Sequence, residues 1–182
     1  FKKWIEEGAD FGGWVGNLEG QPAQASFAAS KPAVSEIQEI YKRLAEGVEA
    51  YEKESWESVT EAGGRVTPLS KTSPLLSVDF RLTTENASDK AIASIGSVAS
   101  NVVHLDLSKT SVSDGALSML NELPKLVRLN LSQTGITDAG LKHLAGLDEL
   151  RYLNLYGSEV SDAGLKNLEG ISSLETIYLW QS

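Results

Sequence analysis

The sequence predicts an α/β solenoid, a stack of similar coils in which each coil contributes a short strand and a short helix. Three segments, starting at His104, Arg128 and Tyr152, follow one another at intervals of 24 residues and repeat the same pattern of leucines. A fixed period in the range of about 20–50 residues is typical of repeat architectures. Within each segment the leucines first alternate with polar residues and then recur every three residues. This change of period indicates a strand followed by helical turns.

The strand of each coil is predicted from strict alternation. Leu129 and Leu131 alternate with Arg128, Asn130 and Ser132, and successive side chains of a strand point to opposite faces. The leucines should therefore face the core and the polar residues should face outward. Equivalent residues of successive coils should form two buried columns, namely Leu105, Leu129, Leu153 and Ile177, and Leu107, Leu131, Leu155 and Leu179.

The helical part of each coil has a start signal. The Thr137 hydroxyl can cap a helix, and Asp138 stands at the positive end of the helix dipole. Leu141 and Leu144 should then line the inner side of the helix. Between strand and helix, the Thr134 hydroxyl is expected to bond the backbone of the turn. Its equivalents in the other coils are Thr110, Ser158 and Ser182.

The first coil departs from the repeat. Phe80 and Leu82 are expected to take the places that Leu105 and Leu107 hold one coil later, which makes this coil one residue longer, with the insertion near residues 99–102. Terminal coils are expected to be atypical because they meet a cap on one side. A fifth coil begins after the fourth and has no helical half, so we expect the boundary at Ser182 to be artificial or the chain to be disordered beyond it.

The chain is predicted to contain three regions. Residues 1–32 should be the tail of a preceding domain and a linker rich in glycine, alanine and serine, since the chain starts without methionine. Residues 33–77 should form a helical cap with a short strand, with a break near residues 52–55 and a second short helix that ends at Gly63-Gly64. Residues 78–182 should form the repeat domain, with four coils and the start of a fifth. The residues expected to cover the first coil are Ile37, Tyr41, Leu44 and Trp56.

Composition excludes several classes of function. The net charge is −9 and acids exceed bases in both halves, so the chain should repel nucleic acid and anionic membranes. There is no cysteine, and therefore no disulfide, thiolate metal site or thiol nucleophile. No apolar run approaches the roughly 20 residues that span a bilayer. We expect no membrane insertion, no nucleic-acid partner and a monomer.

The sequence Thr-Asp-Ala-Gly-Leu at 137–141, with Ser-Asp-Ala-Gly-Leu at 161–165, resembles a bacterial variant of the leucine-rich repeat family, and the resemblance covers residues 78–182. It implies a curved solenoid with parallel strands on the concave face, short helices on the convex face, and protein recognition on the concave face. Residues 1–9 resemble the closing helix of a bacterial c-type cytochrome domain. That resemblance implies an exported protein of the periplasm or cell envelope, with covalent haem in an upstream domain. The Cys-x-x-Cys-His attachment is absent here, so we expect no cofactor in this part.

The outward strand positions are the candidate binding surface. They are polar in the first coils and aromatic in the last ones, and interfaces are enriched in tyrosine, tryptophan and arginine. The alternative is that tyrosine and tryptophan simply suit strands. The candidate protein-binding residues are Arg128, Asn130, Tyr152, Asn154, Tyr156, Tyr178 and Trp180.

The sequence gives little support for a metal site or a catalytic site. Asp114, Asp138 and Asp162 form a column that could hold calcium, but one acid at each helix start is what capping requires. His104 and His143 belong to different parts of their coils, and the sequence has neither a nucleophile elbow nor a phosphate-binding loop. We therefore expect a non-enzymatic protein-interaction module without a metal. The alternative is a spacer that holds a cytochrome domain near its electron-transfer partner.

Overall fold

The computed structural model describes residues 34–51, 53–82 and 88–179. The chain forms two compact units, residues 1–46 and 47–182. In the first unit, helix α2 spans Val34–Ala45, with Glu36 in its first turn and two basic residues in its last, as the helix dipole favours. The apolar spacing continued to Val48, but the helix ends at Ala45, and Gly47 follows with a φ of 70°. The expected linker and cytochrome-like segment lie outside the described residues.

The second unit is built on a six-stranded sheet whose strands follow one another in chain order. The first two strands are antiparallel and all later pairs are parallel. The strands are β1 (Arg65–Pro68), β2 (Leu76–Asp79), β3 (Val102–Asp106), β4 (Arg128–Asn130), β5 (Tyr152–Asn154) and β6 (Thr176–Tyr178). Strand β1 agrees with the short strand that the sequence predicts within residues 33–77.

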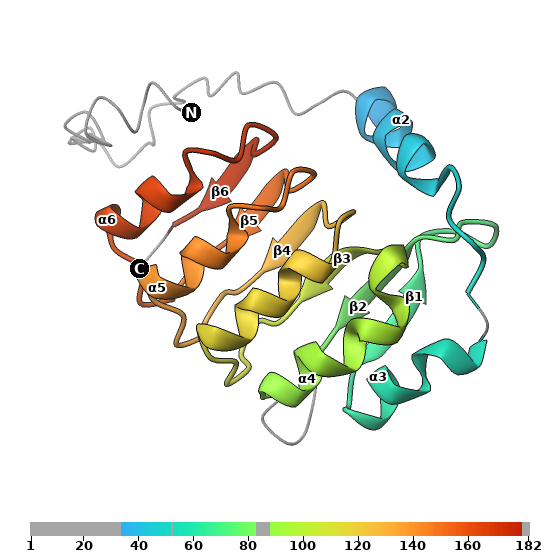
Figure 1. Cartoon of the computed structure of the whole chain (residues 1–182), viewed down its shortest axis with the longest axis horizontal. Coiled ribbons are helices and arrows are strands. Elements are labelled where there is room, and N and C mark those ends of the chain that lie inside the picture. Colours follow the sequence, from blue (N-terminus) through green and yellow to red (C-terminus); the bar gives the residue numbers. More distant parts are fainter. Residues whose placement is uncertain (1–33, 52, 83–87, 180–182) are drawn as a thin grey trace, which may run out of the picture. The chain divides into compact units, whose positions relative to one another are not determined.

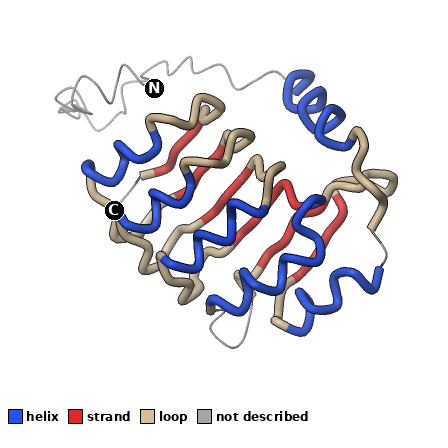
Figure 2. Tube along the Cα trace, in the orientation of Figure 1, coloured by secondary structure: helices blue, strands red, loops and turns tan. Residues whose placement is uncertain are grey.

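Short helices follow each of the strands β2 to β5 and lie along one face of the sheet, as Figure 1 shows. Strand and helix alternate along the tube in Figure 2, which is the pattern that the sequence predicts. The helices are α4 (Asp89–Ser94) with η2 (Ile95–Asn101), η3 (Gly115–Glu122), α5 (Asp138–Leu141) with η4 (Lys142–Leu144), and α6 (Asp162–Leu165) with η5 (Lys166–Leu168). The predicted α/β solenoid with parallel strands is confirmed.

The register of the parallel strands equals the repeat length. Arg128 lies opposite Tyr152, and Leu129 lies opposite Leu153, so each residue lies beside its equivalent in the next coil. A constant offset brings identical positions side by side, so the leucines stack into columns. The leucines of β3, β4 and β5 and those that follow each strand are at most 2% exposed, while Ile177 and Leu179 in the last coil are half-buried. The predicted columns are confirmed, and the core is one continuous cluster.

The turn after each strand also repeats. Lys109, Gln133 and Gly157, which are equivalent positions of three successive coils, all have positive φ values, of 61°, 55° and 66°. The next residue in each turn is a buried hydroxyl residue, and the Thr134 hydroxyl donates to the carbonyl of Leu131 at 2.6 Å. The predicted hydroxyl–turn bond is thus confirmed for Thr134, and the same bond occurs at Thr110 and Ser158. Ser182 lies outside the described residues.

The predicted alignment of the first coil is wrong in its strand. Val78, not Phe80, lies opposite Leu105. Phe80 is buried two residues further on, at the place that Leu107 holds in the next coil, and its N–H donates to the carbonyl of Asp106 at 2.9 Å. Leu82 is 79% exposed. The offset between β2 and β3 is therefore longer than the repeat length, and the register shifts between Leu76 and Ser77. The buried alternation consists of Leu76, Val78 and Phe80 and ends there. Leu82 therefore belongs to the connection between β2 and α4 and not to the strand.

Carboxylates link each coil to the next. One oxygen accepts the N–H, and the other accepts the hydroxyl, of the serine or threonine that starts the next helix. The pairs are Asp89 with Ser113, Asp114 with Thr137, and Asp138 with Ser161, at 2.6–2.9 Å. The hydroxyls of Thr137 and Ser161 accept the N–H two residues on, so the predicted hydroxyl cap is confirmed. The carboxylate contact across coils was not predicted.

A glycine makes room for this carboxylate. A Cβ on Gly140 would lie 2.4 Å from the Asp114 Oδ1, and one on Gly164 would lie 2.1 Å from the Asp138 Oδ1. In these two coils the glycine of the repeated Asp-Ala-Gly-Leu sequence therefore leaves room for the carboxylate of the previous coil. In the second coil the same place is taken by Ala116, and there the segment Gly115–Glu122 is a 3₁₀ helix from its start.

The N-terminal edge of the sheet is covered by η1 (Lys53–Trp56), α3 (Glu57–Glu61) and β1. Val59 is fully buried, and Trp56 packs against the same core. The Ser58 hydroxyl donates to the carbonyl of Ser94, and the buried Asn101 amide donates to the carbonyls of Glu49 and Pro74. The predicted second short helix is confirmed, and Trp56 packs against the core as expected. The predicted break near residues 52–55 is wrong in position, because α2 already ends at Ala45 and Lys53–Trp56 forms η1. Ile37, Tyr41 and Leu44 belong to the other compact unit.

Gly64→Ala tests the packing of this cap. The added methyl would lie 2.6 Å from the Phe80 ring and 2.7 Å from the Val59 Cγ1, and overpacking of this kind costs about 1–3 kcal/mol. Gly96→Ala is the matched control, since nothing lies within 4 Å of its added methyl. Urea denaturation should show a lower midpoint for the first variant only. Equal midpoints would contradict the packing described here.

Gly140→Ala tests the link between coils. Alanine normally favours a helix over glycine by about 1 kcal/mol, so a loss of stability would report displacement of the Asp114 carboxylate. We expect a net loss of about 1–2 kcal/mol, and little change for the control Gly135→Ala, whose methyl meets nothing within 4 Å. The measurement is the free energy of unfolding in urea. A stabilised Gly140→Ala protein would show that the carboxylate contact is not needed.

Candidate functional site

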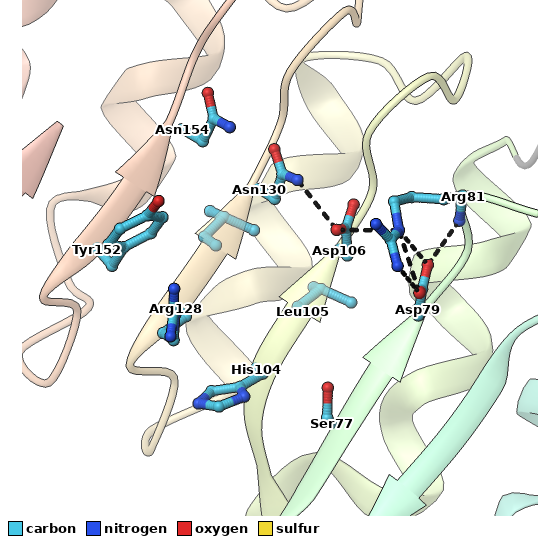
Figure 3. Close-up of a pocket in the computed structure, with 11 residues that line it drawn as sticks. Ser77, Asp79, Arg81, His104, Leu105, Asp106, Arg128, Asn130, Tyr152 and Asn154 are labelled. Carbon is cyan, nitrogen blue, oxygen red and sulfur yellow. Dashed lines mark hydrogen bonds and ion pairs between the residues drawn. The ribbon is translucent and has the colours of Figure 1, made fainter. Parts of the chain in front are cut away.

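The strand side chains that do not enter the core form the open sheet face, opposite the helices. Two rows of side chains cross this face along the strand register. The first row is Ser77, His104, Arg128, Tyr152 and Thr176, and the second is Asp79, Asp106, Asn130, Asn154 and Tyr178. A hollow of about 280 Å³ lies on this face over β2 to β5, and Figure 3 shows the side chains that line it.

Acidic and basic groups are paired at the β2–β3 side of the hollow. The Arg81 guanidinium lies 2.7 Å from the Asp79 Oδ2 and 3.3 Å from the Asp106 Oδ2. The Asn130 Nδ2 donates to the same Asp106 oxygen at 2.9 Å, as the dashed lines in Figure 3 indicate. Partial burial alone would raise the pKa of Asp79, but the hydrogen bonds and charge of Arg81 outweigh burial and lower that pKa.

The second row also has a structural role. The side-chain oxygens of Asp106, Asn130 and Asn154 each accept the backbone N–H two residues further on, at 2.9–3.1 Å. Such bonds mimic a backbone turn and compete with continued strand pairing. An aspartate or asparagine at this position therefore ends the strands β3, β4 and β5, and its side chain also lines the hollow.

Aromatic side chains gather at the β4–β6 side. The Arg128 guanidinium lies 4.4 Å from the centre of the Tyr152 ring, which is the geometry of a cation–π contact. The Tyr152 and Tyr178 rings are 5.1 Å apart and tilted by 49°. Burial raises the pKa of Tyr152, and the neighbouring Tyr178 adds to that shift. Arg128 and Tyr178 remain exposed, so the cluster is open to a ligand.

The structure brings four of the candidate residues together in the hollow, namely Arg128, Asn130, Tyr152 and Asn154. Tyr178 lies on the adjacent strand, and Tyr156 lies in the turn after β5 with 37% of its surface exposed. Trp180 lies outside the described residues. Sequence reasoning left Asp79, Arg81 and Asp106 out of the site. The Asp-x-Arg spacing at 79–81, on a strand face beside another acid, was the available signal.

His104 lies in the first row beside Arg128 and is partly buried. Burial lowers the pKa of His104 to about 4, and the charge of Arg128 contributes to the decrease. The imidazole is therefore neutral at physiological pH and adds no charge to the hollow. The sequence predicts that His104 lies on a strand and His143 on a helix, and the structure places them in β3 and η4.

Among the residues that the structure describes, no cluster of three or more histidine, aspartate or glutamate side chains is placed to hold a metal ion. The carboxylates of Asp114 and Asp138 are occupied by donors of the next coil. No helix within the described ranges is long and apolar enough to span a membrane.

The architecture defines the class of protein. A strand, a turn and a short helix recur from β2 to β5 around leucine columns, which is the fold of a leucine-rich repeat solenoid. In agreement, residues 122–145 match the family model described as Leucine Rich repeat. This match spans one repeat length and includes β4, α5 and η4.

Solved structures with similarity to the chain include two internalins of Listeria monocytogenes. Internalin C2 is 27% identical, with a TM-score of 0.42, over 48% of this chain and 36% of that chain. Internalin F (inlF) is 16% identical, with a TM-score of 0.37, over 50% of this chain and 32% of that chain. The chain thus spans about a third of the length of each internalin. No curated protein shows significant sequence similarity to it.

The stability of the chain should depend on pH through His104. The pKa of this histidine is about 4 in the folded chain and 6.5 in its ordinary state, so between these values the unfolded chain binds more protons. The free energy of unfolding should therefore fall as the pH decreases from 6.5 towards 4. Between about pH 7 and 4.5 this histidine should lower the free energy of unfolding by an amount on the order of 2 kcal/mol. In His104→Gln this part of the decrease should be absent when the free energy of unfolding is measured by urea denaturation at both pH values. Unchanged pH dependence in the variant would refute this assignment.

Proposed function

We propose that the chain is a non-enzymatic protein-interaction module that binds a protein or peptide on the open sheet face. The observation that supports this most directly is the cluster of Arg128, Tyr152 and Tyr178 beside the hollow. Arginine and tyrosine are enriched where binding energy concentrates, because they offer large contact areas and several donors at low entropic cost. Here both residue types stand on rigid strands whose register is set by the core.

The size of the face favours an extended ligand. The strands β2 to β6 are about 4.8 Å apart, so the parallel part of the sheet is only about 19 Å across. A stable interface between whole domains buries about 800 Å² on each partner. A peptide or a protruding loop laid across the strands fits a surface of this width better than a flat domain face does.

Other properties of the parent protein stay predictions of the sequence. These are the region boundaries at 1–32, 33–77 and 78–182, the exported bacterial location, the monomeric state and the absence of a cofactor in this part. The cytochrome resemblance lies in residues that the structure does not describe, and no contact in the described part favours a spacer role. The interaction module is therefore the function that we propose.

Alanine substitution of the aromatic cluster tests this function. A partner can be captured from the envelope fraction of the source bacterium with the immobilised chain and its affinity measured by calorimetry. Tyr178→Ala, and likewise Tyr152→Ala, should weaken binding by about 2 kcal/mol or more, with a nearly unchanged melting temperature. Lys166→Ala, on the helical side, serves as the control with wild-type affinity. A double Tyr152/Tyr178 alanine variant that keeps full affinity would exclude the open sheet face as the binding surface.

A further inference from the structure

The two carboxylates in the hollow are already saturated with donors. One oxygen of Asp106 is ion-paired with Arg81 and accepts from Asn130, and the other accepts from the N–H and hydroxyl of Ser108. Both oxygens of Asp79 accept from Arg81. Neither carboxylate is left to attract a cation from a ligand, because a salt bridge would have to displace these bonds.

Arg128 is in the opposite situation. Within the described part of the chain, no carboxylate lies within ion-pair distance of its guanidinium, which contacts the Tyr152 ring. A guanidinium carries five N–H donors, more than the contact with one tyrosine uses. The adjacent His104 is neutral at physiological pH, since its pKa is about 4. Among the described residues that line the hollow, Arg128 is therefore the one positive charge without a carboxylate partner, and it lies at the β4–β5 side.

Asn154 adds a donor to the same side. Its side-chain oxygen is bound by the N–H of Tyr156. The Nδ2 of Asn130, its equivalent one coil earlier, donates to Asp106, but among the described residues no acceptor binds the Nδ2 of Asn154. Arg128 and Asn154 both line the hollow, on neighbouring strands. The next aromatic residue, Tyr178, lies directly opposite Asn154.

We propose that Arg128 and Asn154 bind the side-chain carboxylate of an aspartate or glutamate in an extended peptide ligand, whose flanking residues rest on Tyr152 and Tyr178. This inference rests on the proposed function and specifies its ligand. Guanidinium groups match the planar geometry of carboxylates and form charge-assisted bonds with them. A free small acid fits less well, because small-molecule sites enclose about 70–90% of their ligand, whereas this hollow is an open depression on the sheet.

The net charge of the chain works against this ligand at long range. A charge of −9 repels an acidic peptide, so the preference must come from short-range contacts in the hollow. At physiological ionic strength, charges further apart than about 8 Å are largely screened. The test should therefore be made near physiological salt, where the local pairing dominates.

Selection of peptides by charge is the decisive experiment. A library of random nonapeptides, displayed with both ends attached to a carrier so that no free carboxyl terminus is present, is selected on the immobilised full chain. The wild-type chain should enrich peptides with aspartate or glutamate at one position, next to an aromatic or apolar residue. Arg128→Glu should lose this preference and enrich lysine or arginine instead. The control Lys166→Glu, on the helical side, should keep the preference for acids.

A single selected peptide then tests the contact itself. Replacement of its acid by the corresponding amide should weaken binding at least tenfold, and Arg128→Gln should weaken binding of the acidic peptide but not of the amide peptide. Peptides that depend on Tyr178 but show no preference for acids would overturn the acidic-ligand inference and leave the proposed function standing. Failure of the wild-type chain to enrich any peptide would overturn both.

Discussion

Parallel pairing at a constant offset of one repeat length is the constraint on which the rest of the repeat domain depends. Because β3 to β6 pair without slippage, every position of one coil lies beside the same position of the next. Leucines therefore meet leucines in the core, and the turn hydroxyls recur at the same depth. A slip of one residue would turn every strand side chain to the other face, so core and open face are determined together.

The carboxylate links reinforce this offset on the helical side. An aspartate in one coil binds the residue that caps the helix in the next, so helix starts are held in step with strands. The Ser161 hydroxyl and N–H hold the pKa of Asp138 below its usual range, which means that the charged form is the one that makes the contact. The helical segments of the coils are short, such as Asp138–Leu141 with Lys142–Leu144, and could not persist alone in water. Its stability comes from the core below it and from the neighbouring coil.

The same regularity explains the open sheet face. Strand positions that a repeat does not need for its core can vary from coil to coil without changing the fold. Here they change from a paired acid–arginine group at β2 and β3 to an arginine–tyrosine cluster at β4 to β6. The asparagine and aspartate positions are less free, because they also end the strands. Specificity is therefore expected to reside mainly in the first row, where Arg128 and Tyr152 lie.

The sequence by itself determined the repeat length, the strand and helix of each coil, the leucine columns and the outward position of Arg128, Tyr152 and Tyr178. All of these follow from local periodicity, which the chain shows three times over. Only the tertiary structure decided the register of β2, since this strand pairs with an antiparallel neighbour on one side and a parallel neighbour on the other. It also decided which charges are paired. Arg81 and Arg128 look alike in sequence, but of these two only Arg81 has carboxylates within reach among the described residues. Such pairing depends on distances between coils, which periodicity alone does not specify.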